Sequence, residues 1–298
     1  MASPVTEAQH AQAVGLDLQP DEVILSILAQ GQQQALTTLD AALPDLAKGA
    51  DLMVQAMLTG GRLIYAGAGS SGLMALADAA ELGGTYGIQP NRIRILMSGG
   101  LLIDARMPGN TEDDSAEATQ AAEDITNKDT VIALSASGST AYPMTIAQIA
   151  KSRGAKVICI ANNADAPMFA LADVAICLPT PPEVIAGSTR MGAGAAQKAA
   201  LNMMSTLMGV RLGHIHDGLM VNVVADNDKL RGRAAGMVQR ITGVDAAWAN
   251  DCLTQSGGAV KPAVLLAAGV KNLTEAQAIL DKTGGHLRAA MAGLKNQT

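Results

Sequence analysis

Short apolar runs alternate with stretches of helical periodicity along the first part of the chain. The apolar runs have the length of strands and lie at residues 63–66, 93–97, 129–134, 156–160 and 174–178. Two of them lead into turns rich in glycine or hydroxyl side chains, after which apolar residues recur at every third or fourth position. This alternation predicts an α/β fold, a three-layer αβα sandwich whose five-stranded parallel sheet has helices on both faces.

The segments on either side of this region have other patterns. Residues 1–18 lack periodicity, Pro20-Asp21-Glu22 predicts a helix start, and a second helical stretch covers residues 43–58. After the last strand the sequence predicts one long helix to about residue 212, then helices at 229–242, 246–253, 259–268 and 274–283. We therefore expect an N-terminal arm and helix (1–45), an α/β domain (46–225) and a small helical C-terminal domain (226–298).

Composition narrows the class of partner. Of the 298 residues, 49% are hydrophobic and 16% charged, which excludes disorder and suits a buried sheet. Aromatic residues make up 2% and the net charge is −6, so we expect no nucleic-acid partner and no membrane partner. Three isolated cysteines and the lack of a signal-like N-terminus or a spanning apolar run predict a soluble cytoplasmic protein.

The turn after the first strand is rich in glycine and carries two hydroxyls. Gly69, Ser70 and Ser71 lie where the strand ends and a helix begins, at the sheet edge where open α/β folds bind ligands. The amide groups of a helix N-terminus favour an anion there. The same turn also fits the dinucleotide fingerprint, but the next strand ends in Ser98-Gly99-Gly100 rather than an acid, so we expect no cofactor. A purely structural turn is the other alternative.

A second turn of this kind follows the third apolar run. Residues 135–140 read Ser-Ala-Ser-Gly-Ser-Thr and precede a helix predicted at 141–152. Four hydroxyls in six residues exceed what a helix cap uses, since a cap needs one. The sequence therefore predicts a second turn that faces an anion.

Acidic residues and histidines supply the other candidates. Thr111 with Asp114 resembles a capping box and predicts a helix at 116–125, whose N-terminus Asp113 and Asp114 would stabilise. Residues 83–87 read as a glycine-dense loop. His214 and His216 suggest a metal site, but no Cys or His partner for them is apparent, so we expect no metal.

Several longer segments carry a family signature. They are GGRLIYAGAGSSG, ALADAAELGGTYG, NTEDD, SASGSTAYP, PEVIAGSTRMGAGAAQKAALNMMST, VRLG, LMVNV, DNDKLRGRA, TGV and GGHLR. Together they resemble the sugar isomerase (SIS) superfamily and, more closely, the N-acetylmuramic acid 6-phosphate etherases. The early VTEAQ and LDLQPDEVILSIL are also similar to that family, so the resemblance covers nearly the whole chain.

The resemblance implies a function. It implies a homodimer with a phosphosugar ligand, and a lyase that removes the D-lactyl ether of N-acetylmuramic acid 6-phosphate during peptidoglycan recycling. The family's two catalytic glutamates correspond to Glu81 in DAAE and to Glu112 in TEDD, which resembles the family's AEDD. By this analogy Glu81 is the acid toward the lactyl oxygen and Glu112 is the base at C2.

The same resemblance suggests the residues that bind substrate. The serines and threonine of the second turn would hold the 6-phosphate, and those of the first would line the sugar site. The full set is Gly69, Ser70, Ser71, Ser135, Ser137, Gly138, Ser139, Thr140, Glu183, Ser188 and Thr189.

The chain departs from the family pattern at several positions. Leu73 and Ser139 replace arginines, Leu82-Gly83-Gly84 replaces Cys-Pro-Pro, and His214 and His216 replace a lysine and a tyrosine. The loss of two cations puts the lactyl specificity in doubt. Two alternatives therefore stay open, an aldose–ketose phosphosugar isomerase and a non-catalytic phosphosugar-binding regulator.

Overall fold

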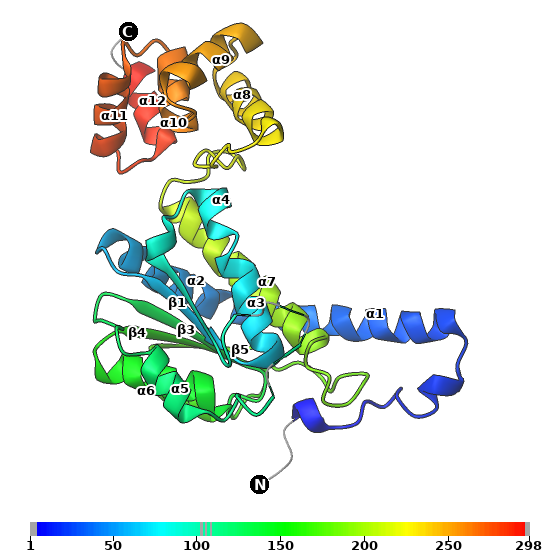
Figure 1. The fold of residues 1–298 in the computed structure, drawn as a ribbon. Coiled ribbons are helices and arrows are strands. Elements are labelled where there is room, and N and C mark those ends of the chain that lie inside the picture. The colour runs from blue at the N-terminus through cyan, green and yellow to red at the C-terminus, as the bar shows by residue number, and fades with distance from the viewer. Residues whose placement is uncertain (1–4, 102–103, 105, 108, 296–298) are drawn as a thin grey trace. The chain divides into compact units, whose positions relative to one another are not determined.

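The computed structural model describes residues 5–101, 104, 106–107 and 109–295 (Figure 1). The chain forms two compact units, and the second one interrupts the first in sequence. The first comprises Met1–Ala80 and Pro90–Ser205, and the second comprises Glu81–Gln89 and Thr206–Thr298. The sequence predicts a boundary near residue 225 and does not predict that residues 81–89 belong with the C-terminal helices.

A five-stranded parallel sheet lies at the centre of the first unit. Its strands are β1 (Leu63–Gly67), β2 (Ile93–Met97), β3 (Thr130–Ser135), β4 (Lys156–Ala161) and β5 (Val174–Cys177), in the order β2-β1-β3-β4-β5. The predicted α/β class is thus confirmed. Because the chain leaves β1 toward one side and β3 toward the other, the ends of these neighbours form the switch point where such folds bind ligands.

Helices cover both faces of this sheet (Figure 1). One face packs against α2 (Leu39–Leu58), α3 (Gly69–Ala79) and α7 (Gly192–Arg211), and the other against α5 (Ser115–Ala121) and α6 (Ala141–Ser152). Successive side chains of a strand point to opposite faces. Ile132 and Val131 are both fully buried, so the central strand β3 is covered on each side, as in other parallel sheets.

The second unit is helical and has its own core. Its helices are α4 (Leu82–Tyr86), α8 (Asp228–Thr242), α9 (Ala246–Gln255), α10 (Val260–Ala267), α11 (Leu273–Lys282) and α12 (Leu287–Lys295). Val238, Cys252 and Val264 are fully buried in it. The sequence predicts four of these helices but not α12 or α4. The predicted loop at 83–87 is wrong, because buried Leu82 and Tyr86 fold it into a short helix.

The helix after the second strand also begins differently from the prediction. Asp114 is the N-cap of α5, and its carboxylate accepts hydrogen bonds from the amides of Ala116 and Glu117. The predicted capping box, which begins at Thr111, is therefore wrong, while the predicted role of Asp114 at the helix N-terminus is confirmed. The helix ends at Ala121, earlier than residue 125.

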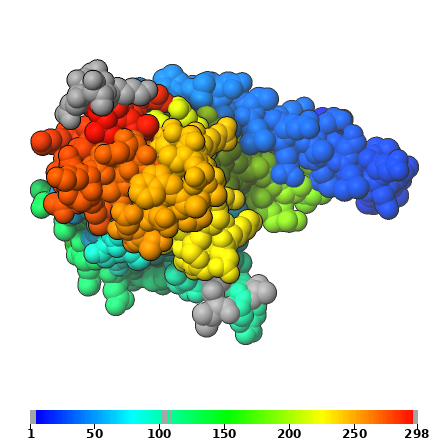
Figure 2. All heavy atoms as spheres, turned by 90° about the horizontal axis from the view of Figure 1, so that it is seen from above, coloured from blue at the N-terminus to red at the C-terminus, as the bar shows by residue number. Residues whose placement is uncertain are grey.

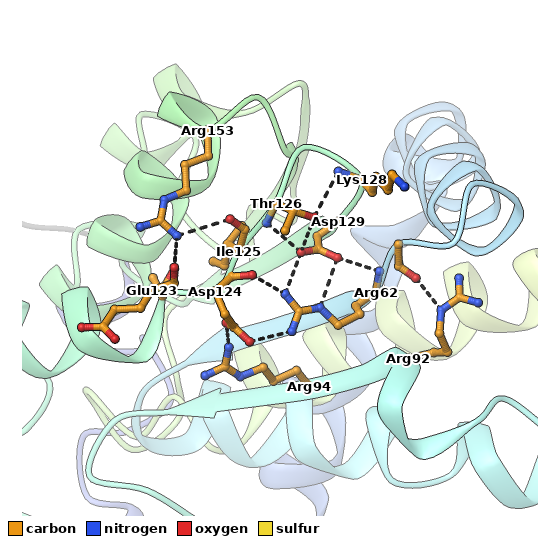
Figure 3. Close-up of polar contacts among 12 residues, drawn as sticks. Arg62, Arg92, Arg94, Glu123, Asp124, Ile125, Thr126, Lys128, Asp129 and Arg153 are labelled. Carbon is orange, nitrogen blue, oxygen red and sulfur yellow. Dashed lines mark hydrogen bonds and ion pairs between the residues drawn. The ribbon is translucent and has the colours of Figure 1, made fainter.

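The amino-terminal edge of the sheet is held by a network of arginines and acids (Figure 3). Asp129, which is 2% exposed, accepts hydrogen bonds from the backbone N–H and the guanidinium of Arg62. Arg62 also donates to Asp124, which pairs with Arg94. Burial raises the pKa of Asp129, but hydrogen bonds from Arg62 and from the backbone of Thr126 outweigh it and leave the pKa below its ordinary value. The network joins the starts of β1 and β3.

Asp129→Asn is expected to lower the free energy of unfolding at pH 7 by about 3 kcal/mol, because it removes the buried carboxylate that pairs with Arg62 and leaves the exposed Asp124 as the acidic partner. A carboxyl whose pKa is lowered by folding stabilises the protein above its unfolded pKa of about 3.9, and this stabilisation is lost as pH falls through the folded value. Urea titrations should therefore show that the difference in free energy of unfolding between wild type and variant becomes smaller from pH 7 to pH 3. Asp45→Asn, which removes an exposed pair with Lys48, is the control and should change stability by less than about 1 kcal/mol. An equal effect of both variants would contradict the role given to Asp129.

Candidate active site

The turn between β1 and α3 brings the backbone close to the start of the helix. A Cβ atom on Gly67 would lie 2.9 Å from the amide nitrogen of Gly72, so only glycine fits there. Gly69 begins α3 with φ +52°, a left-handed conformation that glycine adopts without strain. Among the described residues no side chain caps this helix. The amides at its N-terminus are thus available to an anion at the end of β1.

The turn between β3 and α6 is built by its own hydroxyls. The Oγ atom of Ser135 accepts a hydrogen bond from the amide of Gly138 at 3.0 Å and bonds Thr140 Oγ1 at 2.8 Å and Ser137 Oγ at 3.2 Å. Ser137 also accepts from the amide and the hydroxyl of Ser139. The four hydroxyls therefore form one connected network, which fixes the turn's shape before any ligand binds.

Two further features prepare this turn for a ligand. Gly138 has φ +73°, and a Cβ atom there would clash with the side chain of Ala166, so no other residue fits. Thr140 is the N-cap of α6, but its hydroxyl bonds Ser135 instead of the helix amides. As in α3, the N-terminus of α6 has no side-chain cap among the described residues.

Glu112 lies between these two turns. A Cβ atom on Gly69 would be 2.6 Å from Oε1 of Glu112, so the carboxylate lies directly against the first turn. The backbone carbonyl of Glu112 accepts a hydrogen bond from the amide of Tyr142, in the first turn of α6, at 3.0 Å. Gly67 and Leu134 are paired neighbours at the ends of β1 and β3. The structure thus brings Glu112 and both turns together at one edge of the sheet.

Glu81 follows α3 in the chain and belongs to the second unit. Its side chain is exposed, and its backbone has helical angles as the N-cap of α4. Within the described chain, the carboxylates of Glu81 and Glu112 have no hydrogen-bond or ion-pair partner. The catalytic roles of Glu81 and Glu112 stay predictions.

The remaining predicted residues lie before α7. Glu183 is 6% exposed, and its two carboxylate oxygens accept hydrogen bonds from the amides of Gly192 and Ala193 at 2.9 and 2.8 Å. Its carboxylate therefore caps α7, and contact with a ligand stays a prediction. Ser188 and Thr189 are half-buried in the turn that leads into α7, and their contact with substrate likewise stays a prediction.

Sequence reasoning missed a buried carboxylate in the last turn of α3. Asp78 is 1% exposed and accepts hydrogen bonds from Tyr65, Asn202 and Ser205 at 2.8 to 3.1 Å. Burial raises its pKa, and these bonds only partly offset that rise. One signal in the sequence was available, because Asp78 lies on the same helix face as Ser71 and Ala75, both of which are buried.

The two histidines have separate partners. Nδ1 of His214 is 2.6 Å from the carbonyl oxygen of Tyr86, while Nε2 of His216 is 3.7 Å from a carboxylate oxygen of Asp217. In the part of the chain that the structure describes, no three His, Cys, Asp or Glu residues are grouped to hold a metal ion.

The chain is similar to known proteins over nearly its whole length. Residues 29–162 match the family model of the SIS domain. An N-acetylmuramic acid 6-phosphate etherase from Deinococcus radiodurans is 38% identical over 288 residues, which are 96% of this chain and 94% of that protein. The etherase of Serratia proteamaculans is 37% identical over 96% of this chain and 97% of its own length.

A solved structure has the same fold. It is a Bacteroides fragilis protein assigned as a phosphosugar isomerase involved in capsule formation, with a TM-score of 0.50 and 21% identity over 63% of this chain and 88% of that one. At this identity the likeness concerns the fold alone.

Ser135→Ala is expected to weaken phosphosugar binding about tenfold, because the loss of several hydrogen bonds of roughly 1 kcal/mol each loosens the turn. Calorimetry with N-acetylglucosamine 6-phosphate measures this effect. Ser152→Ala is the matched control, since among the described residues that hydroxyl donates only to the carbonyl of Ile149, at the other end of α6. Unchanged affinity in Ser135→Ala would remove the second turn from the binding site.

Proposed function

The chain belongs to the N-acetylmuramic acid 6-phosphate etherase family, and we propose that it works as a carbon–oxygen lyase on that sugar. The products are N-acetylglucosamine 6-phosphate and D-lactate. The observation that carries the proposal is the position of Glu112. Its carboxylate lies against the first turn, and its backbone carbonyl accepts a hydrogen bond from the start of α6. A carboxylate beside two uncapped helix N-termini suits a base that acts on a bound phosphosugar.

The chemistry requires one base and one acid. In the ring-opened sugar the C2 proton is adjacent to the aldehyde, so Glu112 removes it and an enolate-like species forms. The C3–O bond then breaks, its electron pair goes to the lactyl oxygen, and Glu81 donates a proton there. Water adds to C3 of the resulting alkene, and C2 takes up a proton again. Each such acid or base contributes about 10²- to 10⁴-fold to the rate.

The phosphate is held without the family's two arginines. Hydroxyls of the second turn and the amides of the α6 N-terminus supply neutral donors, which bind phosphate through hydrogen bonds and the helix dipole. Ser70 and Ser71 at the start of α3 line the sugar side. The substitutions at Leu73 and Ser139 thus change the type of donor but leave donors in place.

We place the reaction in the cytoplasm, as a step of peptidoglycan recycling. All three cysteines carry free thiols, which a reducing compartment preserves. Burial raises the pKa of Cys159 to about 12, so this thiol is unreactive. None of the helices that the structure describes has both the length and the apolar character needed to cross a bilayer.

The surface of α1 (Asp21–Thr37) supports the proposal of a homodimer. Ala35 is the one residue of α1 that the rest of the described chain buries. Gly31 lies against Val184, while Leu25, 64% exposed, and Leu36, 40% exposed, share another face three turns apart. Figure 2 shows α1, in blue, with much of its surface uncovered. A second copy of the chain would cover these leucines.

Glu112→Gln is expected to lower lactate release from N-acetylmuramic acid 6-phosphate at least about 10²-fold, and Glu81→Gln should have an effect of similar size. A coupled lactate assay measures both. Binding of N-acetylglucosamine 6-phosphate should persist, because neither carboxylate is assigned to the phosphate. Asp113→Asn, an exposed acid beside Glu112, should retain activity. No lactate release from the wild type would overturn the proposed function.

The double variant Leu25→Asp/Leu36→Asp is expected to convert a dimer into a monomer, since buried charges oppose an apolar interface. Size-exclusion chromatography with light scattering should give twice the chain mass for wild type and for the control Gln33→Asp. A wild-type protein of single chain mass would contradict the proposed dimer.

A further inference from the structure

The short helix α4, which follows Glu81, contacts the rest of the second unit at several points. The amide of Val224 donates a hydrogen bond to the carbonyl of Gly84 at 3.1 Å. The hydroxyl of Tyr86 lies 3.1 Å from that of Thr206. A Cβ atom on Gly209 would lie 2.9 Å from the Tyr86 ring, so a glycine is needed for the ring to pack there. A five-residue helix is marginal by itself, so these contacts determine its conformation.

Two side chains hold the end of α4. The carbonyl oxygen of Tyr86 is 2.6 Å from Nδ1 of His214 and accepts a hydrogen bond from the side-chain amide of Asn222 at 2.9 Å. Since a carbonyl can only accept, His214 donates from Nδ1, which fixes its tautomer. The last carbonyls of a helix lack partners within the helix, and these two side chains supply them. Gly87, with φ +66°, ends α4 and leaves room for Asn222.

His214 is neutral in this position. Burial, with smaller contributions from the nearby Lys261 and His286, lowers its pKa to about 4, although the hydrogen bond to Tyr86 favours the charged ring. Its ring packs edge-on against that of Tyr86, with centroids 6.4 Å apart. A neutral histidine supplies an N–H donor without burying a charge, which is less costly.

We propose that His214 and Asn222 are positioning residues for the general acid Glu81. By holding the C-terminal end of α4, they fix the backbone at its N-cap, from which the Glu81 side chain projects. That side chain has no partner of its own among the described residues, so its placement depends on this backbone. The inference rests on the proposed function, because it needs Glu81 to deliver the proton.

We call the hydrogen bonds from His214 and Asn222 to the carbonyl of Tyr86 the clamp. His214→Phe tests it, because phenylalanine keeps an aromatic ring but lacks the N–H donor. We expect kcat for lactate release to fall up to about 10²-fold with KM unchanged, since a displacement of about 1 Å affects the proton transfer and not the binding of the phosphosugar. The fraction of folded sites is measured by calorimetric titration with N-acetylglucosamine 6-phosphate, and kcat is corrected for it. His214→Gln, which restores an N–H donor, should recover most of the lost rate.

His216→Phe is the matched control, because His216 makes no contact with α4 among the contacts described and should keep kcat. If His214→Phe keeps the wild-type kcat, the proposal fails. It also fails if His214→Gln is as slow as His214→Phe, because ring packing rather than the hydrogen bond would then be responsible.

Hydrogen exchange separates the clamp from the activity. Amides of residues 81–89 should exchange faster in His214→Phe than in wild type or His216→Phe, while those of α6 remain unchanged. Unchanged exchange in 81–89 would overturn the clamp whatever the activity. If exchange is faster in His214→Phe but the wild type releases no lactate, the clamp exists and the proposed function is overturned. The catalytic role given to the clamp then fails with it.

Discussion

The parallel pairing of β1 with β3 is the constraint on which the site depends. It places the ends of two neighbouring strands side by side, and each strand leads into a helix whose N-terminus has no side-chain cap among the described residues. The glycines at 69 and 138 take conformations that other residues adopt at a cost, so each turn is fixed by the choice of residue. Glu112 then lies between two sets of amide donors, where a phosphosugar can be bound and deprotonated.

The amino and carboxyl edges of the sheet differ in their charged groups. At the amino edge arginines and acids neutralise one another and hold the strands together, as Asp129 and Arg62 do. At the carboxyl edge, neutral hydroxyls and amides form the turns, and the carboxylate of Glu112 has no hydrogen-bond or ion-pair partner among the described residues. A chain with a net charge of −6 can therefore present an anion site, because in the proposed function local donors rather than the overall field bind the phosphate.

The sequence predicts the parts of the fold that depend on local pattern. Buried strands are continuous apolar runs and the two turns are marked by their glycines and hydroxyls, so β1, β3 and both turns are found directly. The role of Glu112 came only from the family resemblance, since a carboxylate before a helix is ordinarily read as a cap. Helix α4 could not be predicted because glycine disfavours helices, and residues distant in sequence, such as His214 and Asn222, stabilise it.

The central claim is that the C3–O bond of the lactyl ether is the bond that breaks and that water then adds to C3. Turnover in H₂¹⁸O, followed by mass spectrometry of both products, tests it most directly. The account predicts one ¹⁸O atom at C3 of N-acetylglucosamine 6-phosphate and none from water in the ether oxygen of D-lactate. Incorporation of ¹⁸O into that lactate hydroxyl, with an unlabelled C3 hydroxyl, would mean cleavage on the lactyl side and would contradict the elimination and hydration sequence.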